Sequence, residues 1–403
     1  MEAKKRQLKG DYSRGSIAGN VMGLALPVLL AELVNVLYSI VDRIYIGHIP
    51  GLGAAALTGV GIAFPLISLI GAFSNLTALG GAPLCSIARG ENDEEKAGAI
   101  LEVAFTLILL CAAVLTTVMF VLRTPILFFM GADEMTIGCA RDYFEIYVLG
   151  SVFVLISLGM NSFITLQGYP RVGMLTVLIG AVANIVLAPI LIFDLKLGVR
   201  GAALATVISQ ALSAGWVVRF LTRGPVRLKI RRLRLEASTA LSIVHLGLSG
   251  FTFKFTNSIT QALVNVTLRA YGGDMAMYYI GAMSIKNTTR EVIHQPISAI
   301  TEGCKPVLGF NYGARLYGRV SRTIGFTTAA SLSYNTLIWA LVMLFPAAFA
   351  GIFSSDPLLV ETCVPCMRAY FGAFVFLSLQ QIGQHTFIGL NHPNYAVFFS
   401  LFR

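Results

Sequence analysis

The first apolar stretch of the chain carries a stripe of polar side chains. Its members are three, three and four residues apart, namely Glu32, Asn35, Tyr38 and Asp42. Residues at these spacings lie on one face of a helix. Burial disfavours the ionised form of a carboxylate, whereas a bound cation favours that form. The stripe therefore predicts a face at which Asp42, aided by its neighbours, exchanges a proton or a sodium ion. The alternative is that Asp42 lies at the end of its helix and pairs with Arg43 or a loop.

A second polar group lies in the apolar segment 275–300 and is basic. Lys286, Arg290 and His294 follow one another at intervals of four and therefore share a helical face. An ionisable group within a membrane-spanning helix is a candidate for function. This stripe predicts either recognition of an anionic or zwitterionic substrate head, or a structural group neutralised by Glu291 and Glu302. Both interpretations stay open at this point.

Three further polar residues are candidates for lining a substrate cavity. Gln380 and Gln384 lie four apart in the segment 359–387 and offer hydrogen-bond donors and acceptors beside the basic stripe. Tyr143, in the segment 138–165, offers a hydroxyl on an apolar ring. With Asn35 and the basic stripe, these side chains make up the predicted lining of the cavity.

The composition excludes an ordinary soluble protein. Apolar residues make up 56% of the chain and charged residues only 12%, against about 45–50% and about 25% in soluble domains. The sequence contains no HExxH, GxSxG or Walker A motif, and its six cysteines form no ligand cluster. We therefore expect a multi-pass membrane protein that is not an enzyme and needs neither a metal nor a cofactor.

The net charge of +10 is unevenly distributed along the chain. Basic residues gather before the first apolar run, in the link between the sixth and seventh runs, and after the eighth run, at 4–14, 219–234 and 315–322. These are alternate loops, as the positive-inside rule requires when the N-terminus is cytoplasmic. The charge therefore predicts membrane topology, and we expect no binding of nucleic acid.

Ten segments are long and apolar enough to span a bilayer, which needs about 20 residues. They are 17–46, 54–80, 97–122, 138–165, 172–193, 200–221, 243–270, 275–300, 321–345 and 359–387, and an eleventh begins near Asn394. Pro27 lies inside the first segment and removes a backbone donor, so a kink is expected there.

Hydrophilic breaks between these segments recur at a constant offset of 223 in the numbering. The matched pairs are Pro83 and Pro306, Gly90 and Gly313, and Pro170 and Pro393. Such internal duplication of a helical bundle is typical of secondary transporters. The sequence predicts a cytoplasmic tail (1–16), a first lobe (17–221), a cytoplasmic basic linker (222–242) and a second lobe (243–403). By the same offset Arg403 corresponds to Gly180, so we expect the second lobe to lack about two helices.

Three stretches of the chain carry a family resemblance, namely LPVLLAELVNVLYSIVDRIYIGH (Leu26–His48), GVRGAALATVISQ (Gly198–Gln210) and PVLGFNYGAR (Pro306–Arg315). They resemble the multidrug and toxic compound extrusion (MATE) family, in particular its bacterial multidrug-pump branch. The resemblance implies an all-α membrane protein of twelve helices in two pseudo-symmetric six-helix bundles around a central cavity, here with ten complete helices and the start of the eleventh. It also implies a cation-coupled antiporter of the bacterial plasma membrane that exports amphipathic, often cationic compounds in exchange for H⁺ or Na⁺. We expect a monomer whose partners are such small molecules and the lipid bilayer.

The resemblance also places Asn184 and Thr206 at positions of the family's cation site. Ala188 stands where cation-handling members usually have an aspartate, which leaves few oxygens for a sodium ion. We therefore expect proton coupling rather than sodium coupling. Ala188 also leaves open a changed mechanism or a loss of activity, and helix–helix hydrogen bonding is the alternative role of Asn184 and Thr206. The alternative function is a flippase or exporter for an anionic or lipid-linked precursor, which the basic stripe favours.

Overall fold

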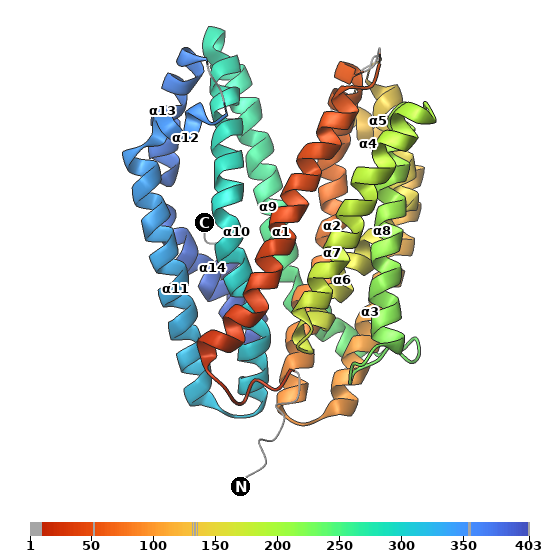
Figure 1. Cartoon of the computed structure of the whole chain (residues 1–403), viewed down its shortest axis with the longest axis vertical. Helices are drawn as coiled ribbons and strands as arrows, with labels where there is room; N and C mark the ends of the chain where they lie inside the picture. Colours follow the sequence, from red (N-terminus) through yellow and green to blue (C-terminus); the bar gives the residue numbers. More distant parts are fainter. Residues whose placement is uncertain are drawn as a thin grey trace.

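The structure, a computed structural model, describes residues 10–50, 53–130, 132, 134, 136–353 and 356–401. These residues are almost entirely helical, as their long apolar segments predict (Figure 1). The first half comprises α1 (Ile17–Gly47), α2 (Gly53–Gly90), α3 (Glu94–Val121), α4 (Arg123–Phe129), α5 (Ile137–Leu149), α6 (Ser151–Leu166), α7 (Pro170–Pro189) and α8 (Gly198–Arg223). The second comprises α9 (Ala237–Tyr271), α10 (Ala276–Gly313), α11 (Tyr317–Leu344), α12 (Pro346–Gly351), α13 (Pro357–Phe371), α14 (Phe374–Gly389) and α15 (Pro393–Leu401).

All ten predicted segments are helical, but two of them are bent pairs. The predicted segment 138–165 divides into α5 and α6, which meet at 54°, and 359–387 divides into α13 and α14, which meet at 45°. The break between α5 and α6 falls at Gly150, where an added Cβ would lie 2.4 Å from a methyl of Val207. The sequence marked each of these segments as one span and did not indicate the bend within it, because the residues around the bend are apolar like the rest of the segment. By contrast, α1 continues through Pro27, and the predicted kink stays a prediction.

The helices are those of a multi-pass membrane protein. Among the described residues six helices are long and apolar enough to cross a membrane, or up to eight if each bent pair counts as one span. The lobe boundaries predicted from the sequence differ slightly from the helix ends, because α8 runs to Arg223 and α9 already begins at Ala237.

The internal duplication is visible in the backbone. Helices α2 and α10 end at Gly90 and Gly313, and the turn after each contains a residue with positive φ, 62° at Asn92 and 58° at Arg315. The short helices α4 and α12 begin at Arg123 and Pro346, which are related by the same sequence offset as the glycines. The offset read from proline and glycine positions therefore relates real elements of the two halves.

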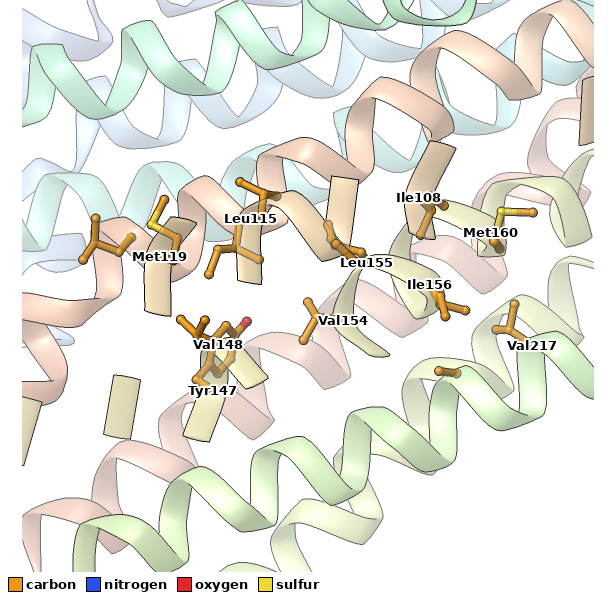
Figure 2. Packing of buried hydrophobic residues seen from close by; sticks show 14 of the residues in the cluster. Ile108, Leu115, Met119, Tyr147, Val148, Val154, Leu155, Ile156, Met160 and Val217 are labelled. Atoms are coloured by element: carbon orange, nitrogen blue, oxygen red, sulfur yellow. The ribbon is translucent and has the colours of Figure 1, made fainter. Parts of the chain in front are cut away.

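The core of the first half is a continuous layer between α3, α5, α6 and α8. Figure 2 shows Leu115 and Met119 of α3 facing Val148 of α5 and Leu155 of α6. Phe144, like Leu155, is almost completely buried. Because lipid tails are as apolar as these side chains, close packing rather than exclusion from water stabilises such a layer in a membrane.

The two halves touch at the end of the bundle that carries the N-terminal segment 10–16, the linker 224–236 and the α10–α11 turn. We call it the basic end, after the arginines of these segments. Here α2 and α10 meet backbone to backbone, since a Cβ on Gly90 would lie 2.0 Å from the Phe310 carbonyl oxygen. The reciprocal contact places a Cβ on Gly313 at 2.0 Å from the Ile87 carbonyl oxygen. From this end the two halves lean apart toward the opposite, far end (Figure 1).

The segment 10–16, which we call the strap, also joins the halves at the basic end. The Tyr12 hydroxyl donates to the Leu166 carbonyl of the first half at 3.3 Å. From the second half, Asn311 and Arg319 donate to the Tyr12 carbonyl at 3.1 and 3.0 Å. Arg319 donates further to the carbonyls of Arg14 and Gly15. The strap therefore has partners in both halves.

The basic linker runs back along the first half. Its backbone amides at Arg231 and Arg234 donate to Glu102 and Thr106 of α3, at 3.2 and 3.1 Å. These bonds hold the linker against α3 and leave its arginine side chains at the basic end.

Candidate functional site

The carboxylate of Asp42 lies inside the first half, near the end of α1. Helix α1 contacts α10 and α11 of the second half as well as α7 and α8 of the first. Asp42 is only 9% exposed, and its buried Oδ1 atom accepts no hydrogen bond from the described residues. A buried charge of this kind is costly unless it is compensated. The carboxylate therefore suits a proton or a bound cation.

Arg43, the alternative partner of Asp42, lies within electrostatic range of this carboxylate but forms no ion pair within 4 Å with it. Arg43 is exposed and places its guanidinium carbon 5.3 Å from the centre of the Phe64 ring. Among the ion pairs within 4 Å that the described residues form, none involves Asp42. The carboxylate is therefore shielded from water without a direct ion pair in the described part of the chain.

Tyrosines surround this carboxylate. The hydroxyls of Tyr38 and Tyr143 lie within electrostatic range of Asp42 and within hydrogen-bonding reach of Thr206. Tyr143 is 4% exposed and stacks on Tyr147, with ring centres 6.2 Å apart. The sequence analysis missed Tyr147, although its spacing of four from Tyr143 could have indicated it. These hydroxyls can hold a proton or orient a small ligand beside the acid.

Asn184 and Thr206 meet where α7 packs on α8. The Asn184 amide nitrogen donates to the Thr206 hydroxyl at 3.2 Å, and that hydroxyl donates to the Ala202 carbonyl at 3.1 Å. This contact is the helix–helix bond that the sequence left open as their alternative role. The side-chain Oδ1 atom of Asn184 is buried and has no hydrogen-bond partner among the described residues, so this acceptor remains for a ligand.

Ala188 is fully buried one turn after Asn184 and contributes only a methyl group. No group of three or more His, Cys, Asp and Glu side chains in the described part of the chain could hold a metal ion. The acceptors near Asp42 are thus one amide oxygen and several hydroxyls, fewer charged ligands than a cation such as Na⁺ favours.

The rest of the stripe on α1 is less enclosed. Glu32 is half-buried and Asn35 is exposed, with its backbone carbonyl accepting the Ser39 hydroxyl at 2.9 Å. The structure therefore brings Tyr38 and Asp42 to the cluster of Tyr143, Asn184 and Thr206.

The basic stripe lies on α10, facing α13 and α14. Lys286 is 3% exposed, and its Nζ atom lies 4.0 Å from the centre of the Tyr370 ring. Arg290 is half-buried, and its Nε atom is buried without a hydrogen-bond partner among the described residues. His294 is hydrogen-bonded to the Gln381 amide. The stripe thus lies within the second half rather than on its surface.

The two acids expected to neutralise this stripe differ in position. Glu291 is exposed, whereas Glu302 binds Lys305 at 2.6 Å and lies, like His294, within electrostatic range of His385. In the described part of the second half, Lys286 and Lys305 are buried, whereas no aspartate or glutamate is. The buried charged side chains of this described part are therefore lysines, and Glu302 compensates the charge of one of them, Lys305.

Gln380 and Gln384 are hydrogen-bonded to α15. The Gln384 amide donates to the Ser400 hydroxyl at 2.8 Å, and the Gln380 amide donates to the Phe399 carbonyl. Both side chains are buried where α14 meets α15. This placement differs from the predicted cavity lining because the amides serve to join the two helices.

A cavity of about 820 Å³ lies at the basic end between the two halves. Its lining includes Glu91 and Asp93 at the α2–α3 turn, His245 of α9, and His392 and Pro393 between α14 and α15. The sequence analysis singled out Pro393 only as a repeat marker. The hydrophilic breaks that contribute these residues are far apart in sequence, so no local pattern could indicate the cavity.

Internal duplication of a helical bundle is a common build of membrane transporters. The sequence model of the family described as MatE matches residues 27–190 and 251–403. The chain therefore belongs to the MatE family, which confirms the resemblance and the all-α fold inferred from the sequence.

Known multidrug export proteins are similar to this chain in sequence, and known transporter structures are similar to it in fold. The chain is 24% identical over 351 residues to the multidrug export protein MepA of Staphylococcus haemolyticus, covering 87% of this chain and 76% of the relative. It is 22% identical over 352 residues to MepA of Staphylococcus aureus, with the same coverage. A solved outward-facing conformation of a multidrug resistance MATE family transporter of the MOP superfamily superimposes with a TM-score of 0.88 at 21% identity, covering 100% of this chain and 88% of that one. At such identity the structural likeness shows the fold.

Proposed function

We propose that this protein exports amphipathic, often cationic compounds across the bacterial plasma membrane in exchange for protons, with Asp42 as the exchanging group. One observation carries the proposal: the Asp42 Oδ1 atom is buried and unpartnered among the described residues, amid tyrosine and threonine hydroxyls. Membership of the MatE family and the multidrug export named for its relatives support the direction and the substrate class.

The mechanism follows from the position of α1 between the two halves. With the far end open, Asp42 takes up a proton and a cationic substrate leaves, so the positive charge beside the carboxylate is conserved. Helix α1 contacts both halves, so the charge state of Asp42 favours one arrangement of the halves over the other. The halves then rock about their interface, the proton leaves toward the cytoplasm, and a new substrate binds.

The proposed topology places the basic end in the cytoplasm. The linker, the strap and the α10–α11 turn all bring arginines to that end, as the positive-inside rule requires. The close contact of Gly90 and Gly313 with the opposite helices then closes the cytoplasmic side. The structure thus corresponds, in this proposal, to the state that opens outward, and the protein works as a monomer.

The side chains around Asp42 favour proton coupling over sodium coupling. Ala188 supplies no oxygen, and Asp42 is the one acid whose buried carboxylate lies in the cluster among the described residues. A single carboxylate with neutral hydroxyls can hold a proton, but it offers a sodium ion only one negatively charged ligand.

Efflux from proteoliposomes under separately imposed proton and sodium gradients tests the proposal. We expect Asp42→Asn to abolish efflux of a cationic dye driven by the proton gradient, while Asp194→Asn, which changes an exposed aspartate, leaves it intact. Ala188→Asp supplies a second carboxylate and is expected to add stimulation by sodium. Unimpaired efflux by Asp42→Asn would remove this residue from the mechanism.

A second candidate function is a flippase or exporter for an anionic or lipid-linked precursor. The buried Lys286 is the observation that favours it.

A further inference from the structure

The two halves present corresponding faces around opposite charges. Tyr147 of α5 and Tyr370 of α13 are related by the offset of the internal repeat. The same offset relates Tyr143 to Cys366, one turn earlier on each helix. The face of α13 that carries Cys366 and Tyr370 is therefore the counterpart of the face of α5 that carries the two tyrosines.

In the first half this face belongs to the cluster around an acid, because Tyr143 lies within electrostatic range of Asp42. In the second half it meets a base. Lys286 Nζ lies 4.0 Å from the centre of the Tyr370 ring, and Cys366 lies within electrostatic range of the same ammonium group. A cation over the face of an aromatic ring is favourable, and more so away from water.

The two repeats carry different charges at corresponding positions of their first and second helices. At an offset of 222 or 223, Asp42 corresponds to Val264 or Asn265, neither of which is charged. Lys286 corresponds to Ala63, a fully buried alanine of α2. The first helix of the second repeat therefore lacks the acid of the first repeat, and its second helix carries a base where the first repeat has an alanine.

The surroundings extend this positive charge along α10. Arg290, one turn after Lys286, has a buried Nε atom with no hydrogen-bond partner in the described structure. The nearest acid on the same helix is the exposed Glu291, and Glu302 binds Lys305. A guanidinium presents a fork of donors that matches carboxylate and phosphate oxygens. Charged groups shielded from water interact strongly with an opposite charge.

We propose that the second half binds the anionic group of a transported amphipathic molecule, a carboxylate or a phosphate, between Lys286 and Arg290. This inference rests on the proposed export function and narrows its substrates to zwitterions, whose cationic part is exchanged at Asp42 in the first half. The tyrosine faces that correspond in the two halves supply aromatic surface to each end of such a molecule.

Equilibrium binding to the purified full chain tests this inference. The probes are a zwitterionic rhodamine with a free carboxylate and its cationic methyl ester, which differ only in the anionic group. Binding is measured by fluorescence polarisation in nanodiscs of phosphatidylcholine, without ion gradients. We expect Lys286→Met to weaken binding of the carboxylate by about tenfold or more, as loss of one partner of a buried charge pair does. Binding of the ester is expected to change less than about twofold.

Arg290→Gln is expected to act in the same direction, and Lys196→Met, at an exposed lysine of the far end, serves as the matched control. Nanodiscs containing phosphatidylglycerol distinguish the source of the anion. If this lipid weakens carboxylate binding to the wild type but not to Lys286→Met, a lipid headgroup also occupies the site. Equal weakening of both probes, or no weakening of either, would overturn the inference.

The same assay separates this inference from the proposed function. Asp42→Asn is expected to keep the preference of the wild type for the carboxylate over the ester, because the anionic group binds in the other half. Unimpaired proton-driven efflux by Asp42→Asn, together with an intact carboxylate preference, would contradict proton exchange at Asp42 and leave the anion site standing. Loss of the preference only in Lys286→Met and Arg290→Gln would support the anion site whatever drives transport.

Discussion

Replacing Gly90 with alanine should loosen the contact that closes the basic end. The added Cβ would lie 2.0 Å from the Phe310 carbonyl oxygen and 2.8 Å from the Ala314 nitrogen. Ordinary contact begins at 3.4 Å, so α2 and α10 must separate until the distance of 2.0 Å has grown to that value. Both contacted atoms belong to the backbone, so no side chain can rotate away. Overpacking of this kind costs about 1–3 kcal/mol, which corresponds to a shift of about 5–150-fold between two conformations.

Distance measurements between spin labels at the basic end would detect this shift. Glu95 of α3 and Arg322 of α11 are exposed and belong to different halves, so cysteines at these positions, on a background without the native cysteines, report the separation of the halves. We expect Gly90→Ala to add a population at longer distance, and Gly313→Ala to do the same by the reciprocal contact. Gly98→Ala is the control, since its Cβ would meet no atom within 4 Å.

A distance distribution of Gly90→Ala identical to that of the wild type would refute the reasoning, provided that helicity by circular dichroism shows the variant to be folded. It would mean that the α2–α10 contact relaxes locally and does not set the arrangement of the halves.

Two further outcomes follow from the basic end. Arg319→Ala removes a donor that binds the Tyr12 carbonyl, and charge-assisted hydrogen bonds of this type contribute about 1.5–3 kcal/mol. Tryptic cleavage after the exposed Arg14 should therefore accelerate about tenfold. An unchanged cleavage rate would contradict the inference that Arg319 holds the strap in place. Hydrogen bonds from Thr239 and then Ser238 lower the pKa of Glu236 at the start of α9. Because its pKa is depressed in the folded protein, Glu236 stabilises this helix start above the carboxyl's ordinary pKa, and the effect is lost as pH falls through the folded value. The protection factors of the amides at the start of α9, which correct for the slower intrinsic exchange in acid, should fall as pH decreases. Thr239→Ala should move that transition to higher pH.

The helices and their duplication could be predicted because a bilayer demands long apolar segments and leaves hydrophilic breaks only between them. The matched prolines Pro83 and Pro306 then related the halves, although the structure places them inside α2 and α10 rather than in breaks between helices. The bend at Gly150 could not be predicted, because it depends on the close approach of Val207 from another helix.

The candidate sites were predictable to different degrees. Tyr38 and Asp42 share a helical face, so their joint position followed from local periodicity. The burial of Gln384 against Ser400 did not, because it depends on which helix lies opposite. The contact of Lys286 with Tyr370 joins residues of different helices, so no local pattern predicts it. The sequence shows only that Tyr370 corresponds to Tyr147 by the offset of the repeat.

The exchange of a proton for substrate at Asp42 is tested most directly by counting protons. A cationic dye is added to the purified protein in a weakly buffered solution near neutral pH, and proton release is followed with a pH indicator. The wild type should release protons as the dye binds, and Asp42→Asn should release none while Asp194→Asn behaves as the wild type does. Equal proton release by the wild type and Asp42→Asn would contradict the exchange at this carboxylate.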